Sequence, residues 1–167
     1  MQVRTTPKHG YEKETLLGFL DNNRAVMVWK LDGVSEEDAR RPMVDSGTSL
    51  LGLVKHLAWV ERSWFQSTFA GQEMDFPWSK EDPDADFRIE PGESIADIVA
   101  LYQSAVADCN AVIATRDLDE RAAGGRDNPS LRWIMGHMVE ETARHAGHAD
   151  IVRELIDGKT GYLPRRT

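Results

Sequence analysis

This sequence has little cysteine, no cluster of positive charge and no long uninterrupted apolar run, and each shortage excludes a class of protein. The one cysteine, Cys109, excludes a disulfide within the chain and fits a reducing compartment. Against 28 Asp and Glu residues there are 20 Lys and Arg residues, a net charge of −8, with no basic stripe beyond the short Arg165, Arg166 tail. We therefore expect neither nucleic acid nor an anionic membrane as a partner.

The N-terminal segment MQVRTTPKHGYEKE lacks the apolar centre of an export signal. No stretch of the chain approaches the about 20 consecutive apolar residues of a membrane-spanning helix. These observations predict a cytoplasmic protein. A chain of 167 residues suits a single domain over 1–167 that is large enough for a proper hydrophobic core.

Four segments have the apolar period of amphipathic helices, and no segment has the convincing period-two alternation of a strand. The polar run SEEDARRP after the first segment is expected to be loop. The pattern predicts an all-α fold, a four-helix bundle with a long loop between its second and third helices. The expected helices run from about Tyr11 to Lys30, from Thr48 or Ser49 to about Phe69, from Ser94 through Val112, and from just after Asp127 or Asn128, with Pro129 in the first turn, to Gly158.

The connection from Gly71 to Glu93 is longer than a compact bundle needs, a length typical of a functional cover or a crossover. Four apolar residues, Met74, Phe76, Trp78 and Phe87, are expected to attach it to the bundle. Its acidic residues lack the spacing of an EF-hand, so we interpret them as a solvated loop rather than a second metal site. They are Glu73, Asp75, Glu81, Asp82, Asp84, Asp86, Glu90 and Glu93.

Titratable residues interrupt the apolar stripe of the last helix. At about 100° of rotation per residue, Glu141, His145 and His148 fall within an arc of about 60°, with His137 beside them. Burying such groups without partners would cost several kcal/mol, so something must satisfy them. The whole stripe reads Ile134, Met138, Glu141, His145, His148, Val152 and Leu155.

A divalent metal ion is one partner that would satisfy these groups. Glu141 and His145 are four residues apart and offer a carboxylate oxygen and an imidazole nitrogen, with His56 of the second helix as the best third donor. A hydrogen-bonded polar cluster without metal stays open, because single histidines and i, i+4 Glu–His pairs are common without one. Cys109 lies in an apolar stripe, which favours a core thiol over a catalytic nucleophile.

The motif HLAWVERSWF around His56, with E-x-x-x-H followed by A-G-H in the last helix, resembles the DinB/YfiT-like superfamily of four-helix metalloenzymes. It is most similar to the actinobacterial branch that includes the mini-circle protein. The resemblance covers nearly the whole chain and implies a DinB-type bundle with His56, Glu141 and His145 as metal ligands. His148 stands where many relatives have glutamine and is expected to be an additional ligand or to orient a water. His137 is expected to hydrogen-bond the carboxylate of Glu141.

Glutamate at position 141 is similar to the mycothiol-dependent maleylpyruvate isomerases. The resemblance therefore implies an enzyme that holds zinc or nickel and transfers a low-molecular-weight thiol, of the mycothiol or bacillithiol type, to a small-molecule electrophile, or a related detoxification enzyme. Homodimerisation is common among the relatives. Two alternatives remain: a metal-dependent hydrolase in which Glu141 or His148 assists a bound water, and a non-catalytic metal-binding stress-response protein.

Overall fold

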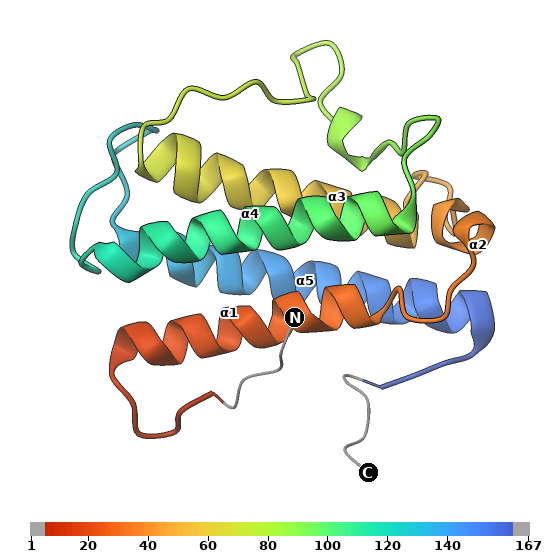
Figure 1. Cartoon of the computed structure of the whole chain (residues 1–167), viewed down its shortest axis with the longest axis horizontal. Coiled ribbons are helices and arrows are strands. Elements are labelled where there is room, and N and C mark those ends of the chain that lie inside the picture. Colours follow the sequence, from red (N-terminus) through yellow and green to blue (C-terminus); the bar gives the residue numbers. More distant parts are fainter. Residues whose placement is uncertain (1–5, 162–167) are drawn as a thin grey trace.

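The computed structural model describes residues 6–161, and helices without any β-strand make up the regular structure of that range. The prediction of an all-α fold is confirmed. Figure 1 shows the long helices lying alongside one another, with α1 packed on α5 and α3 packed on α4 and α5. The long segments are α1 (Glu12–Trp29), α3 (Leu50–Glu61) continued by η1 (Arg62–Phe69), α4 (Ile95–Thr115) and α5 (Leu131–Asp157).

Local capping chemistry sets most of the helix ends. The Ser49 hydroxyl accepts a hydrogen bond from the backbone N–H of Gly52 at 3.1 Å, so Ser49 is the N-cap of α3. Ser94 and Asp97 form the reciprocal capping box expected at the start of α4. Gly158 has φ of +74° and ends α5, as glycine commonly does after a helix.

The expected start of the last helix is wrong by a few residues. Asp127 and Asn128 have φ of +63° and +43°, the left-handed conformation that a helix cannot continue. Ser130 is the N-cap instead, its hydroxyl accepting the backbone N–H of Trp133, and α5 begins at Leu131. Pro129 therefore precedes the cap rather than occupying the first turn.

Two short helices lie in segments that were expected to be loops, α2 (Glu36–Arg40) and η2 (Ala85–Phe87). Elements of three to five residues are too short to show a helical period in the sequence. The side chain of Ser35 caps α2, and the carboxylate of Glu36 accepts the backbone N–H of Ile95 at 2.9 Å. This contact ties α2 to the start of α4.

The second long segment ends in a π-helix, η1, an uncommon element often found at functional sites. Carbonyl groups near its end accept hydrogen bonds from a distant loop: Thr68 from Gly124 at 3.1 Å and Phe69 from Ala123 at 3.0 Å. The loop that precedes α5 is therefore fastened beside η1.

The core contains a fully buried ion pair that the helical period did not predict. Arg24 of α1 and Glu61 of α3 are both 0% exposed. The guanidinium donates two hydrogen bonds of 2.6 Å to the Glu61 carboxylate, and its third nitrogen donates to Asp21 and Asn110 at 2.9 Å. Such bidentate pairing satisfies a charge that would otherwise be costly to bury.

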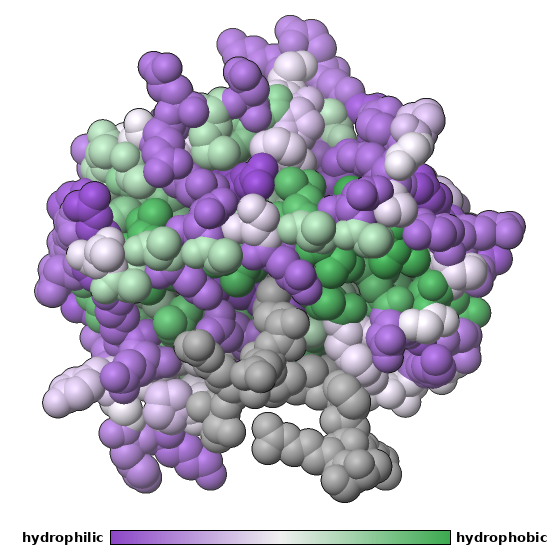
Figure 2. Space-filling model, in the orientation of Figure 1, coloured by the Kyte–Doolittle hydropathy of each residue, from purple (hydrophilic) through white to green (hydrophobic). Residues whose placement is uncertain are grey.

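Within residues 6–161, one helix, α4, is long and apolar enough to be a candidate membrane span by its length and composition alone. The sequence did not predict this candidate, because α4 contains no long continuous apolar run. Length and composition are weak evidence for a span, because core helices pass the same test. Ile98, Tyr102 and Cys109 of α4 are buried against the other helices. In Figure 2 the same view of the molecule shows polar side chains interspersed with apolar ones.

Candidate metal centre

In the middle of α5, the residues that face the core lie one position after those of the predicted stripe. Thr142, Ala146 and Ala149 fill the interior with small side chains. The larger groups that precede the first two, Glu141 and His145, therefore lie along the edge of the core, with side chains 16% and 11% exposed. Two further members of the predicted stripe are exposed rather than buried, His148 and Leu155.

Three side chains from two helices converge at this edge. The Nε2 atom of His145 lies 3.2 Å from Oε1 of Glu141, and Nε2 of His56 lies 3.7 Å from the same oxygen. One ligand atom from each residue lies within 4.8 Å of the others. The structure thus brings together His56, Glu141 and His145, which are up to 89 positions apart in the chain (145 minus 56).

His56 is oriented by two residues of η2. Its Nδ1 lies 2.7 Å from Oδ2 of Asp86, which is 3% exposed, and its ring stacks on Phe87 with centroids 3.9 Å apart and planes inclined by 14°. Donation of the Nδ1 proton to a carboxylate leaves the Nε2 lone pair facing Glu141. Carboxylate-oriented histidine of this kind is usual in metal sites.

The interpretation of Asp86 as a solvated loop acid is therefore wrong. Asp86 is directly followed by Phe87, one of the four apolar residues expected to attach the segment to the bundle. The position of Asp86 beside this expected anchor was the signal in the sequence for its burial, since the neighbour of a docked aromatic residue also lies close to the core. Of the other expected anchors, Phe76 packs edge-on against Trp59 and stacks on Trp78, with centroids 6.3 and 4.6 Å apart.

The segment that carries Asp86 is docked closely on α3. A Cβ atom at Gly52 would lie 2.5 Å from the carbonyl oxygen of Phe87, so only glycine permits this approach. One turn further on, Lys55 donates to the carbonyl of Arg88 at 2.7 Å and to Glu93 at 2.8 Å. Figure 1 shows this segment running along the outer side of α3.

The electrostatic environment favours a charged carboxylate and a neutral imidazole. Partial burial alone would raise the pKa of Glu141, but the adjacent His145, Arg144 and His56 outweigh it and lower that pKa. Burial, with His56 nearby, lowers the pKa of His145 despite the opposing effect of Glu141. These are the protonation states in which both groups donate lone pairs to a metal.

The donor set fits a divalent ion of the zinc type. Ligand atoms about 2.0–2.2 Å from one tetrahedral ion lie roughly 3.3–3.6 Å apart, close to the separations of 3.2 and 3.7 Å found here. The widest separation, up to 4.8 Å, requires the donors to close together slightly. The two histidine rings are oriented to different degrees. Nδ1 of His56 is paired with Asp86, whereas Nδ1 of His145 is buried without a hydrogen-bond partner in the described part of the chain.

The other two candidate residues lie outside this group. The ring of His148 is 5.4 Å from that of His145 and lines an adjacent cavity of about 360 Å³. His137 stacks on Trp133 at 5.2 Å and packs edge-on against Trp64 at 4.7 Å. Its expected hydrogen bond to Glu141 is absent from the described residues, since the ring lies against the two indoles.

The cavity beside the three converging residues is mainly apolar. His145 and His148 form one wall, and Phe87 connects the cavity to the ring of His56. The remaining lining residues are Val44, Ser46, Thr48, Leu53, Ile151 and Val152.

Cys109 is buried, as its position in an apolar stripe predicted. Burial and the nearby Glu61 carboxylate raise the pKa of its thiol well above the usual range. The protein's own thiol is therefore held protonated and inaccessible.

Comparison with known proteins identifies the family of the chain. A sequence comparison with curated proteins gives no match. The family model described as mycothiol-S-transferase matches residues 15–158, a range that includes α3, η2 and the whole of α5. The chain belongs to the mycothiol-S-transferase family, within the DinB/YfiT-like superfamily that its histidine and glutamate motifs predicted.

Proposed function

We propose that this protein is a metal-dependent enzyme that transfers mycothiol, or a similar low-molecular-weight thiol, to an electrophilic small molecule. The observation that carries the proposal is the convergence of His56, Glu141 and His145 at the edge of a cavity. Family membership supports the thiol and the reaction class. We further propose a single-domain, cytoplasmic protein whose four long helices form a DinB-type bundle.

The three residues would hold the metal through His56 Nε2, a Glu141 oxygen and His145 Nε2. Two histidines and one carboxylate leave a coordination position open, as in catalytic rather than structural zinc sites. A divalent ion held by these residues would supply Lewis-acid chemistry, which would lower the pKa of a thiol towards neutral pH. Zinc and nickel are the proposed occupants; imidazole and carboxylate donors accept both.

The chain's own residues supply orientation and a dry surface. Asp86 holds the Nδ1 proton of His56 and so keeps the Nε2 lone pair directed inward. Phe87, Leu53 and Val152 offer apolar surface for the body of the electrophile. The thiolate sulfur forms a bond to the electrophilic carbon, and the leaving group departs with the electrons of the bond that breaks.

A hydrolase is the nearest rival, since the same donors activate water in many enzymes. The family match favours thiol transfer. The two activities separate experimentally, because hydrolysis of simple esters, amides or lactams needs no added thiol.

The first test is elemental analysis of the untagged protein beside the His56→Ala and His145→Ala variants. We expect about one equivalent of zinc or nickel per chain, lost in both variants. Circular dichroism checks that both variants remain folded. Protein that binds no metal after reconstitution, while folded, would contradict the proposed site.

The second test is consumption of a panel of electrophiles with mycothiol and metal. Glu141→Gln should abolish turnover, because an amide is a poor metal ligand. Glu140→Gln is the matched control, as Glu140 is the neighbouring exposed acid and pairs with Arg144 at 2.6 Å. Equal rates in wild type and Glu141→Gln would overturn the proposal. Turnover without thiol would identify a hydrolase instead.

A further inference from the structure

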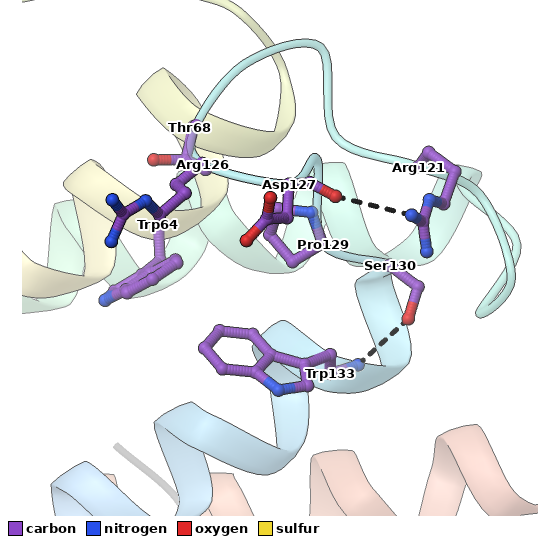
Figure 3. A pocket seen from close by; sticks show the side chains of 9 residues that line it. Trp64, Thr68, Arg121, Arg126, Asp127, Pro129, Ser130 and Trp133 are labelled. Carbon is purple, nitrogen blue, oxygen red and sulfur yellow. Dashed lines mark hydrogen bonds between the residues drawn. The ribbon is translucent and has the colours of Figure 1, made fainter.

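A second cavity, of about 740 Å³, lies between η1, the 121–130 loop and the start of α5. Figure 3 shows its residues, with the indoles of Trp64 and Trp133 on one side and Arg126 reaching past Trp64. The thiol-transfer proposal does not use this cavity. Its lining consists of Trp64, Thr68, Arg121, Gly125, Arg126, Asp127, Pro129, Ser130 and Trp133.

An aromatic wall forms one side of the cavity. The rings of Trp64 and Trp133 have centroids 5.5 Å apart and are inclined by 53°. His137 supports both from behind, parallel to Trp133 and edge-on to Trp64. Trp133 is nevertheless 53% exposed. A large, well-supported and exposed indole in a concave site is typical of a surface that stacks on a ligand.

Two arginines at the rim have no carboxylate partner within residues 6–161, namely Arg121 and Arg126. Arg24, Arg88 and Arg153, by contrast, each hold an acid. Among the described residues, the side chain of Arg121 donates to the backbone carbonyl of Asp127, at 3.3 Å. In a chain with a net charge of −8, unpaired guanidinium groups beside one cavity are available to an anion.

The Asp127 side chain also lines the cavity, so the positive charge there is partly offset. Two arginines against one aspartate still leave an excess of one positive charge. A singly charged ligand group is therefore the best match for this rim.

The loop that carries the arginines is held in place before any ligand binds. Its two sides are joined by a hydrogen bond of 2.9 Å from Ala122 N–H to the carbonyl of Pro129. Ala123 and Gly124 bond to the carbonyls at the end of η1. The tip holds two consecutive non-glycine residues in the left-handed conformation, Asp127 and Asn128. Such backbone strain is concentrated at ligand clamps and active sites.

We propose that this cavity binds a small organic anion with a planar apolar body. The body stacks on Trp133 and Trp64, and Arg126 and Arg121 bind a carboxylate or comparable singly charged group. Trp133 is eight residues before Glu141 on α5, about 12 Å along the helix axis. The site is therefore separate from the metal centre, and ligand binding there does not depend on a bound metal or on thiol transfer.

The competing occupant is a second copy of the chain, since an exposed tryptophan also suits a protein interface. A concave site with unpaired arginines favours a small anion over an apolar helix of a partner. Light scattering decides between the two, because an interface through this surface makes the oligomeric state depend on Trp133.

The test is isothermal titration calorimetry with 2-naphthoate and its neutral match, 2-naphthamide. We expect 2-naphthoate to bind about tenfold or more tightly than the amide, since charge-assisted hydrogen bonds are lost with the charge. Arg126→Gln combined with Arg121→Gln should reduce 2-naphthoate to the affinity of the amide and leave the amide unchanged. Trp133→Ala should weaken both compounds by about two- to tenfold.

Three controls make the result decisive. Arg116→Gln, at an exposed arginine paired with Glu120, should bind 2-naphthoate as wild type does. His56→Ala should also bind normally, which distinguishes failure at the metal centre from failure here. The arginine variants change only exposed side chains, so the test survives a folding defect in Trp133→Ala. Equal affinity for both compounds, or a dimer that Trp133→Ala converts to monomer, would overturn the proposal.

Discussion

Two groups of charged and titratable side chains lie inside this protein, and they are built on opposite plans. Arg24 and Glu61 join α1 to α3 deep in the core, and the guanidinium donates to the carboxylate at 2.6 Å through two nitrogens. His56, Glu141 and His145 join α3 to α5 at the edge, where three potential ligand atoms face one another. In the first group two donors of one residue meet two acceptors of the other, whereas in the second a hydrogen bond of 3.2 Å joins His145 to Glu141 and Nε2 of His56 lies 3.7 Å from the same oxygen.

The difference separates a structural ion pair from a group for which we propose a metal-binding role. The Arg24–Glu61 pair neutralises itself and needs nothing from outside the chain. At the edge, both histidine nitrogens approach one oxygen of Glu141, and a cation would join all three groups. Exposure follows the same division, because the pair is 0% exposed whereas the side chains of Glu141 and His145 are 16% and 11% exposed and His145 lines the cavity.

The largest effect is expected when the Arg24–Glu61 pair is broken. Arg24→Met leaves the Glu61 carboxylate buried without a counter-charge, and we expect a loss of about 3–5 kcal/mol in the free energy of unfolding. Urea denaturation measures it. The double variant Arg24→Met, Glu61→Leu should recover most of the loss, because it removes both charges. A single variant as stable as wild type would show that the pair does not stabilise the fold.

The next effect concerns the residue that orients His56. Asp86→Asn should weaken metal binding by about 10–100-fold, because the amide cannot hold the Nδ1 proton as a carboxylate does. Competition against a chelator measures the affinity. Asp84→Asn is the control, as Asp84 is an exposed acid two residues earlier. Unchanged affinity in Asp86→Asn would mean that Asp86 has no role in orienting a ligand.

A smaller effect appears in the pH dependence of the metal-free protein. The folded pKa of His145 is lowered from its ordinary 6.5, so the unfolded state takes up a proton at a higher pH than the folded state does. The free energy of unfolding should therefore decrease as pH falls from 7 through 6.5 and below. His145→Gln should lose less stability over that range, measured by urea denaturation with chelator present. Parallel losses in both proteins would contradict this account.

The smallest effect is expected at His148. This residue is exposed and lies outside the group of converging ligand atoms, so His148→Gln should change metal affinity by no more than about twofold. The same chelator competition measures it. A loss of metal affinity beyond about tenfold would identify His148 as a metal ligand in addition to His56, Glu141 and His145.

Periodicity and capping residues predicted much of this fold from the sequence. Ser49, Ser94 and Gly158 end or begin helices through local interactions with neighbouring backbone groups, so their capping roles can be predicted from the sequence alone. The spacing of Glu141 and His145 is also a local property of one helix. The start of α5 was missed because Ser130, rather than an earlier residue, makes the capping bond.

Contacts between distant segments could not be predicted in the same way. Asp86 resembles its acidic neighbours until η2 docks it against His56, 30 residues earlier. Arg24 is hidden for the same reason, since its burial depends on Glu61 of another helix. The core side of α5 was misplaced by one residue because the small side chains of Thr142 and Ala146, not the large ones beside them, face the interior.

The close docking of η2 on α3 affects how long an ion would stay. The contacts that hold η2 are buried ones, because Gly52, Lys55 and Asp86 are buried and Phe87 packs against the hydrophobic core. A short element such as η2 opens locally, while the rest of the protein stays folded, only when these contacts separate together. The residence time of an ion at His56 would then follow the opening of this covering segment, and exchange would proceed without unfolding of the helices.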